Sequence, residues 1–388
     1  MESGFALFRT GGKRIRSIRC ASTLLLLPWL VPTLNAATGG TVIAWGYNYY
    51  GQTNVPIGLS GVTAVAAGKE HTVALKGDGT VVAWGRNFYG ETTVPAGLSG
   101  VTAIAAGDNH SVALKSDGTV VVWGQSYFGQ AAVPTGLTGV TAIAAASIYT
   151  VAVKNNGTVV AWQNNGNVET AVPVGLSGIA AIATGGPPNG GHTLALKNDG
   201  TLVAWGDNAY GQTNVPPSLT GVAVIAAGYW HNAALKSDGT VVTWGYNVSG
   251  QLNVPAGLSG VRAIAAGAEH TVAVKNDGTP VAWGGNGNGQ TNVPTGLIGV
   301  TAIAAGGYHT VALVQTNYLY FGDLKFYAGT TLQGLMGQQF RIDYADVLGS
   351  VTNWLTLTNI TLPYSPYLVI DPASPGRTNR FYRAVPLP

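Results

Sequence analysis

All six histidines of the chain could act as general bases or metal ligands, because imidazole ionises near neutral pH and binds transition metals. They occupy one position of a repeated segment: His71, His110, His192, His231, His270 and His309, with Tyr149 in that position of one further copy. A catalytic histidine works with partners that occur once in a chain. A histidine that returns with every repeat is instead predicted to be a framework residue that bonds the backbone at the start of a strand.

Two other residue types recur with the same period. The aspartates of the K-x-D-G segments suggest calcium, but one carboxylate per repeat cannot supply the roughly six to eight oxygens that Ca²⁺ requires. No G-x-S-x-G, H-E-x-x-H, phosphate loop or close carboxylate pair occurs outside the repeat. We therefore predict no catalytic residue, no metal, no cofactor and no enzyme activity.

Seven tryptophans are predicted to pack between repeats: Trp45, Trp84, Trp123, Trp162, Trp205, Trp244 and Trp283.

The repeat organises most of the chain. Six copies have 39 residues and the fourth has 43. Each holds three short apolar runs, such as GVTAIAAG, HTVAL and TVVAWG, and Asp-Gly or Asn-Gly between the second and third predicts a type I′ hairpin. A fourth, edge-like strand is predicted in GQTNVP, whose proline excludes a central ladder position. The copies begin at Thr41, Thr80, Thr119, Thr158, Thr201, Thr240 and Thr279.

Both faces of the predicted sheets are apolar. Alternation along the third run places Val82 and Trp84 on one face and Val81 and Ala83 on the other. Sheets with neighbours on both sides need that pattern, whereas a lone sandwich has a polar outer face. The sequence therefore predicts an all-β fold, a seven-bladed β-propeller of four-stranded sheets.

The two ends of the array predict how the ring closes. It begins with a third strand, Thr41–Gly46, and ends with a second strand, His309–Val314. Pairing of residues 42–45 with the run from Thr310 would complete the last blade and remove both open edges. The alternative is that residues 318–321 fold back into the same place.

The chain outside the repeats predicts export. Within residues 1–36, a basic region (Lys13, Arg14, Arg16 and Arg19) precedes an apolar stretch that is shorter than a membrane span, which indicates a signal peptide cleaved after Ala36. We therefore expect a secreted or cell-surface protein with no membrane span in the mature chain. The propeller occupies residues 37–317. Residues 318–388 read as a small sandwich-like β module and resemble modules that end many secreted bacterial repeat proteins.

The charge balance depends on the signal. The chain holds 19 Lys and Arg and 16 Asp and Glu, but residues 1–36 contribute five basic and one acidic residue, which leaves 14 and 15. No basic stripe remains to neutralise phosphates, which argues against nucleic-acid binding. The sole cysteine, Cys20, also lies in the signal, so the mature chain has no disulfide.

The positions that vary between copies are the informative ones. Successive strands of each sheet are predicted to run in opposite directions. The G-x-x-H loop after the first strand and the W-G-x-N-x-x-G loop after the third therefore share one rim of the propeller, and the Asp-Gly turn and the GLSG loop share the other. Aromatic residues gathered on the loops of one rigid face are typical of a binding surface. The alternative is that they pack over the central channel. The candidate binding residues are Tyr47, Tyr49, Tyr50, Arg86, Phe88, Tyr89, Tyr127, Phe128, Tyr210, Tyr229, Trp230, Tyr246 and Tyr308.

The motif A-W-G-x-N-x-x-G-Q-x-x-V-P, followed by A-A-G-x-x-H-x-x-A-L-K-x-D-G, resembles the regulator of chromosome condensation repeat family over residues 41–317. It is most similar to the short-repeat bacterial form, which includes the secreted propeller-type (type II) β-lactamase inhibitor proteins. That resemblance implies protein binding through aromatic loops on one face. The contact residues it implies here are Tyr49, Tyr50, Phe88, Tyr89, Tyr127, Phe128, Tyr229 and Trp230.

The chain departs from that pattern in two ways. The inhibitors have no C-terminal module, and small residues (Ser249, Gly287 and Asn288) stand here where a continuous aromatic ring is expected. The nucleotide-exchange role of the eukaryotic members needs longer blades and a protruding wedge that this chain lacks.

Three functions remain open. The first is a secreted, monomeric, non-catalytic propeller that binds a protein through its aromatic face, in the manner of an inhibitor. The second is a carbohydrate-binding or cell-surface adhesive protein. The third, which the lack of a non-repeating catalytic constellation disfavours, is an enzyme acting on polysaccharides.

Overall fold

The computed structural model describes residues 39–163 and 170–314 in full, and five further strands between residues 329 and 386. The predicted signal peptide, Cys20 and the alternative closing segment 318–321 lie outside the described residues. Within the described ranges, no helix is long and apolar enough to cross a membrane.

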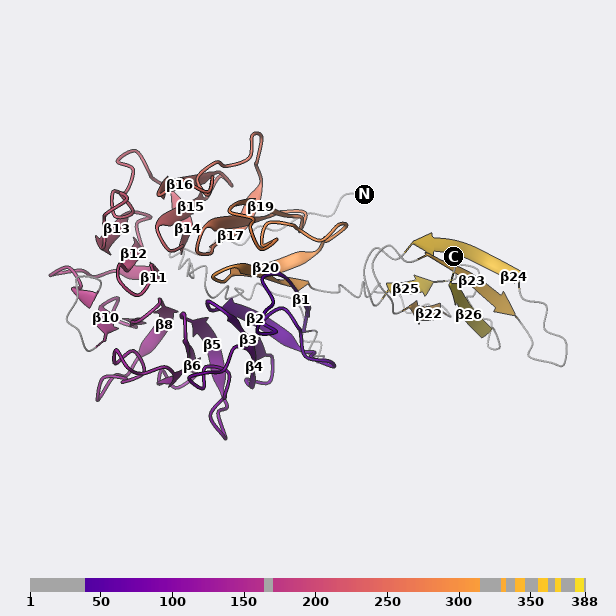
Figure 1. Cartoon of the computed structure of the whole chain (residues 1–388), viewed down its shortest axis with the longest axis horizontal. Coiled ribbons are helices and arrows are strands. Elements are labelled where there is room, and N and C mark those ends of the chain that lie inside the picture. Colours follow the sequence, from indigo (N-terminus) through magenta and orange to yellow (C-terminus); the bar gives the residue numbers. More distant parts are fainter. Residues whose placement is uncertain are drawn as a thin grey trace, which may run out of the picture.

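Seven three-stranded antiparallel sheets surround a common centre (Figure 1). The first strand of each sheet lines the central channel, mostly with alanine, and the second strand lies in the middle of its sheet. We number these blades 1 to 7. In order they are β2 (Val62–Ala67), β3 (His71–Lys76) and β4 (Val81–Gly85); β5 (Val101–Ala106), β6 (His110–Lys115) and β7 (Val120–Gly124); β8 (Val140–Ala145), β9 (Thr150–Lys154) and β10 (Val159–Trp162); β11 (Ile179–Gly185), β12 (His192–Lys197) and β13 (Leu202–Gly206); β14 (Val222–Ala227), β15 (His231–Lys236) and β16 (Val241–Gly245); β17 (Val261–Ala266), β18 (His270–Lys275) and β19 (Pro280–Gly284); and β20 (Val300–Ala305), β21 (His309–Val314) and β1 (Thr41–Gly46).

The N-terminal strand closes the ring. β1 pairs antiparallel with β21 in blade 7, with Thr41 opposite Val314 and Gly46 opposite His309. The indole N–H of Trp45 donates to the Gln290 carbonyl at 3.0 Å, which fixes the same strand against blade 6. The predicted closure is confirmed, because this pairing gives blade 7 the third strand that its own part of the chain lacks.

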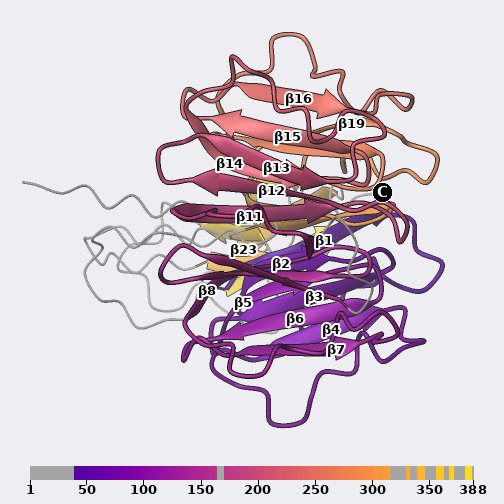
Figure 2. The ribbon, with the colours of Figure 1, turned by 90° about the vertical axis from the view of Figure 1, so that its left-hand side faces the viewer.

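The apolar core lies between the blades. Between blades 1 and 2, Val73 and Leu75 of β3 pack against Ile104 and Trp123, and an equivalent cluster fills each of the other six gaps. Seen from the side, neighbouring sheets lie face to face (Figure 2). Both faces of a blade are therefore apolar, as the alternation in the sequence predicts.

The predicted fourth strand is wrong. Residues 51–56 contain a short turn and no strand; the N–H of Asn54 bonds the Gly51 carbonyl at 3.0 Å and the N–H of Val55 bonds the Thr53 carbonyl at 3.0 Å. The side-chain oxygen of Asn48 accepts a hydrogen bond from the Thr53 N–H at 3.0 Å. Because Pro56 has no N–H and these groups are already bonded, no ladder can form with the third strand.

The repeated histidines join each blade to the next. Thr72 donates its hydroxyl hydrogen to the Gln52 carbonyl at 2.8 Å, so its oxygen accepts a hydrogen from Nε2 of His309 at 3.1 Å. Five further histidines make the same kind of bond to a Ser, Thr or Asn of the next blade, at 2.7–3.1 Å. Tyr149 takes this place in blade 3 and donates to the His192 carbonyl at 2.7 Å. The histidines are framework residues, as predicted, although they bond side chains rather than the backbone.

The protonation state of these histidines follows from their environment. All six side chains are fully buried. Burial lowers the pKa to about 3 in His71, His231 and His270 and to about 4 in the other three. At neutral pH the rings are therefore neutral, with the hydrogen on Nε2 and with Nδ1 unprotonated.

Five strands of the predicted C-terminal module are described. β22 pairs with β25, and β23 lies between β24 and β26. Their bounds are β22 (Gly329–Leu332), β23 (Gln339–Ala345), β24 (Leu355–Thr361), β25 (Tyr367–Ile370) and β26 (Phe381–Pro386).

Candidate binding surface

Loops of two kinds share one rim of the propeller. The loop before each histidine meets the loop that follows the third strand: the N–H of Tyr47 bonds the Tyr308 carbonyl at 2.8 Å, and the N–H of Arg86 bonds the Glu70 carbonyl at 2.9 Å. On the opposite rim the K-x-D-G turns meet the GLSG loops, through bonds such as the one from Gly77 N–H to the Gly61 carbonyl at 2.8 Å. These pairings match the predicted rims. We call the first the aromatic rim.

The thirteen candidate residues differ in exposure. Eight residues are half-buried, and one of them, Phe128, also packs against the apolar core between blades 3 and 4. The other seven are Tyr47, Tyr50, Arg86, Tyr229, Trp230, Tyr246 and Tyr308. The five exposed rings are Tyr49 (77%), Phe88 (67%), Tyr89 (37%), Tyr127 (77%) and Tyr210 (48%).

A first aromatic cluster runs along blades 7, 1 and 2. Ring centroids lie 6.5 Å apart for Tyr308 and Tyr47, 6.4 Å for Tyr47 and Tyr49, and 4.8 Å for Tyr49 and Tyr50. Tyr50 meets Phe88 edge to face at 5.4 Å. A further edge contact joins Tyr89 to Tyr127 at 5.8 Å. Most of these contacts have the edge-to-face geometry that aromatic pairs prefer.

Arg86 joins the parts of this cluster. Its guanidinium carbon lies 5.8 Å from the ring centre of Tyr50, 4.8 Å from Phe88 and 5.3 Å from Tyr89. A cation over several ring faces holds them in place by cation–π attraction. The first aromatic cluster is therefore a continuous surface organised around one positive charge.

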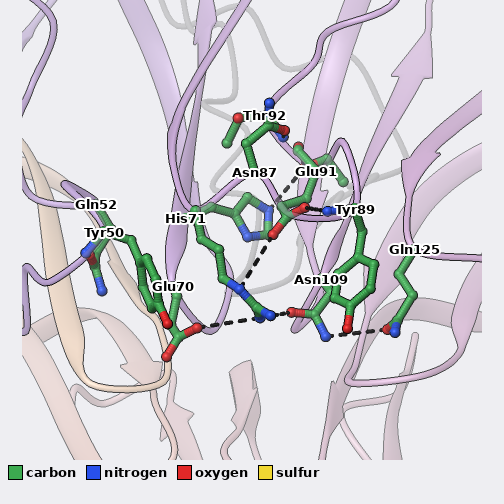
Figure 3. A network of polar contacts seen from close by, with 12 residues as sticks. Tyr50, Gln52, Glu70, His71, Asn87, Tyr89, Glu91, Thr92, Asn109 and Gln125 are labelled. Carbon is green, nitrogen blue, oxygen red and sulfur yellow. Dashed lines mark hydrogen bonds and ion pairs between the residues drawn. The ribbon is translucent and has the colours of Figure 1, made fainter.

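Two carboxylates balance that charge (Figure 3). Glu70 lies 3.4 Å from the Arg86 guanidinium, and the Glu91 carboxylate, fully buried, lies 4.0 Å from it. Asn109 accepts a hydrogen bond from Arg86 at 2.6 Å and donates to Gln125 at 3.2 Å. Sequence reasoning missed this network, although Glu91 stands in a position where most other copies carry glutamine.

A second aromatic cluster covers blades 4 and 5. Tyr210 lies 4.6 Å from Tyr246 and 6.1 Å from Trp230, and Trp230 lies 5.7 Å from Tyr246. Tyr229 completes it at 5.6 Å from Trp230. Around blade 6, between the two clusters, the loops carry residues such as Gly287 and Asn288, so the aromatic surface is interrupted, as the sequence predicts.

A side-chain bridge spans the mouth of the channel. Tyr229 of blade 5 donates its phenol hydrogen to Asp108 of blade 2 at 3.0 Å, and Ser147 of blade 3 donates to the other carboxylate oxygen at 2.7 Å. Burial raises the pKa of Asp108, and burial together with this carboxylate raises the pKa of Tyr229. Lys69 lines the same cavity. The bridge ties together blades that are not neighbours, and nothing in the sequence pattern predicted it.

The aspartates of the opposite rim have a local role. Asp78 accepts from the backbone N–H and the hydroxyl of Thr80 at 3.0 and 2.6 Å, and these bonds lower its pKa to about 2. The same turn recurs at Asp117, Asp199 and Asp238. Among the described residues, no three His, Cys, Asp or Glu side chains meet in a way that could hold a metal ion.

Comparison with known proteins identifies the repeat. The profile described as "Regulator of chromosome condensation (RCC1) repeat" matches residues 62–91, 101–130, 189–212, 222–251 and 261–290, which fall in five of the seven blades. The resemblance inferred from the repeat motif is therefore confirmed for these segments. No curated protein matches the chain in sequence.

Solved structures share the fold. Prp20p from Saccharomyces cerevisiae, described with its binding to Gsp1p and histones, aligns with a TM-score of 0.62 at 20% identity, over 73% of this chain and 93% of that one. Human WBSCR16 aligns at 0.54 and 17% identity, over 71% and 98%. The CRINKLY WD40 ectodomain of the Arabidopsis thaliana receptor kinase ACR4 aligns at 0.51 and 22% identity, over 66% and 92%. At these identities the likeness shows the fold alone.

Proposed function

We propose that this chain, a propeller built from regulator of chromosome condensation repeats, is an exported, non-catalytic protein that binds another protein through its aromatic rim. The observation that carries the proposal is the first aromatic cluster. It consists of residues that vary between copies, it lies on loops held by a rigid scaffold, and its outermost rings are exposed. Large, rigid aromatic side chains dominate the energetics of protein interfaces.

A structural neighbour and the form of the channel support a protein partner rather than a small molecule. Prp20p is described as binding Gsp1p and histones, and it shares the propeller architecture. The channel is lined mainly by alanine and glycine, and its mouth is bridged by Asp108 and Tyr229. The outer face of the rim is thus the favoured contact surface.

Export is proposed from the sequence. Residues 1–36 have the basic start and short apolar stretch of a signal peptide. N-terminal sequencing of the protein from the culture medium should give a first residue at or near Ala37. A chain recovered only inside the cell, with its first 36 residues intact, would contradict export.

The binding proposal is tested with a surface variant and a matched control. The triple variant Tyr49→Ser, Phe88→Ser, Tyr127→Ser removes three exposed rings that stand at turn tips. The control, Ile57→Ser with Val174→Ser, removes two fully exposed apolar side chains near the opposite rim. The immobilised full-length protein and both variants are used to capture extracellular proteins of the producing cell, and the affinity of each identified partner is then measured.

The expected result is a partner that the wild type and the control bind equally well and the triple variant binds about 30-fold or more weakly, because loss of hot-spot aromatics costs about 2 kcal/mol or more. Equal binding by all three proteins, or no partner at all, would overturn the proposal. A panel of class A β-lactamases tests the narrower inhibitor role, which fails if none is inhibited.

A carbohydrate partner is the second candidate. The exposed rings of Tyr49, which lies between Asn48 and Asn54, and of Tyr127 can also stack on sugar rings. A glycan array that includes envelope polysaccharides separates the two, since binding to a glycan that is lost in the triple variant would favour this candidate.

A further inference from the structure

The two aromatic clusters differ in one respect. In the first cluster, Arg86 supplies a cation that lies over three rings and is balanced by Glu70 and Glu91. In the loop that follows the third strand of blade 5, the position of Arg86 holds Tyr246, and in blade 4 it holds Asp207. Among the described residues, the second cluster thus has rings and carboxylates but no arginine.

The carboxylates near the second cluster have no internal cation. Asp207 lies three residues before Tyr210 in the same turn and accepts from Gln212 at 2.8 Å. Glu269 accepts from Ser249, which lies three residues after Tyr246, at 3.0 Å. Neither carboxylate forms an ion pair within the part of the chain that the structure describes.

The aromatic rim as a whole has a net negative charge. Its described loops carry two cations, Lys69 and Arg86, against five carboxylates: Glu70, Glu91, Asp108, Asp207 and Glu269. Burial raises the pKa of the Tyr308 phenol, and the negative charges of Glu269, Asp108 and Glu70 raise it further. The opposite rim carries seven described cations and five carboxylates. The two rims therefore have opposite net charge.

We propose that the second aromatic cluster receives an arginine or lysine side chain of the bound protein, which lies over the Trp230 and Tyr246 rings and faces Asp207 and Glu269. This inference rests on the proposed protein-binding function. Tryptophan is the best ring for a cation–π contact, and arginine is the residue that most often makes one. The partner's basic side chain would thus do in the second cluster what Arg86 does in the first.

A charge-specific peptide tests the inference without knowledge of the partner. Acetyl-tetra-arginine amide is titrated into the full-length protein, and binding is followed through the Trp230 indole N–H resonance, assigned with Trp230→Phe. Acetyl-tetra-citrulline amide is the neutral, nearly isosteric control. The test variant is Asp207→Asn with Glu269→Gln. The matched control, Asp199→Asn with Asp277→Asn, makes the same change in charge on the opposite rim.

The arginine peptide is expected to shift the Trp230 resonance and the citrulline peptide is not. Binding should weaken when NaCl rises from about 50 to about 500 mM, because salt screens exposed charges. The test variant should bind about fivefold or more weakly and the control variant within about twofold of wild type. Equal effects of the two peptides, equal affinities of the two variants, or no shift at about 5 mM arginine peptide would overturn the inference.

Binding measurements with the captured partner distinguish a failure of this inference from a failure of the protein-binding function on which it rests. A partner that depends on Tyr49, Phe88 and Tyr127 but binds the Asp207→Asn, Glu269→Gln variant with unchanged affinity would overturn the basic contact and leave the protein-binding function standing. Failure to capture any partner, with the arginine peptide still bound, would overturn the function and not the cation site.

Discussion

The buried histidines make the propeller sensitive to acid. In the folded chain their pKa is about 3 to 4 because burial disfavours the charged ring, whereas in the unfolded chain it is about 6.5. Below pH 6.5 the unfolded chain therefore takes up protons that the folded chain does not bind. The stability contributed by the neutral rings is fully present above about pH 7 and is lost as the pH falls toward the folded-state values.

The size of the effect follows from these values. Each histidine contributes about 2 kcal/mol less to the free energy of unfolding at pH 5 than at pH 7.5. The reason is that pH 5 lies about 1.5 units below the unfolded-state pKa, and each unit corresponds to about 1.4 kcal/mol. Six such residues give a loss of about 12 kcal/mol, comparable with the whole stability of a typical domain, about 5–15 kcal/mol. Asp108, whose pKa burial raises, acts in the opposite direction but is one group against six.

The assay is denaturant unfolding at pH 7.5, 6.5, 5.5 and 5.0, combined with NMR titration of the histidine ring protons in the folded chain. The free energy of unfolding should fall steeply below pH 6.5, and the ring protons should not titrate near that pH while the chain stays folded. The reasoning is refuted if the stability at pH 5 lies within about 2 kcal/mol of that at pH 7.5, or if folded-state histidines titrate near 6.5.

Three further predictions test the framework by thermal and denaturant unfolding. Deleting residues 39–46 reopens the edge of blade 7 and should cost several kcal/mol; an unchanged melting temperature would contradict ring closure. Gly107→Ala should cost about 2 kcal/mol or more, because the added Cβ would overlap a carbonyl of the next blade, whereas Gly287→Ala has open space and should change stability by less than about 0.5 kcal/mol; equal effects would argue against tight packing there. Arg86→Gln should cost about 3 kcal/mol, because it leaves the buried Glu91 carboxylate without its cation, and adding Glu91→Gln should restore most of that loss; no recovery would show that the pair is not coupled.

The repeat made most of the fold predictable. A fixed period implies equivalent units, and apolar residues on both faces of one strand, as at Val81 and Val82, imply a neighbour on each side. Closure by Thr41–Gly46 followed from counting strand types, since the last blade lacked a third strand. These inferences need no knowledge of individual contacts.

The prediction of a fourth strand in each blade is wrong for a local reason. The segment GQTNVP predicts an edge strand, but the short polar side chain of Asn48 bonds the nearby backbone and stabilises a turn instead. Competition between such side chains and a ladder depends on geometry that the pattern does not contain.

The candidate surface was only partly predictable. Variation between copies located the aromatic rim, but it could not tell that Phe128 is half-buried against the core while Tyr127, its neighbour, stays exposed. The bridge between Asp108 and Tyr229 joins residues 121 positions apart in the sequence, on two blades that are not neighbours in the ring. Its recognition requires the closed ring, since only closure brings the two loops to the same channel mouth.

The central claim is that the aromatic rim is the surface that binds a protein, and hydrogen exchange on the complex with a captured partner tests it most directly. The account predicts slower amide exchange in the loops that carry Tyr49, Phe88, Tyr127 and Trp230, with no change in the K-x-D-G turns of the opposite rim. Protection confined to those turns, or to the strands between residues 329 and 386, would contradict it.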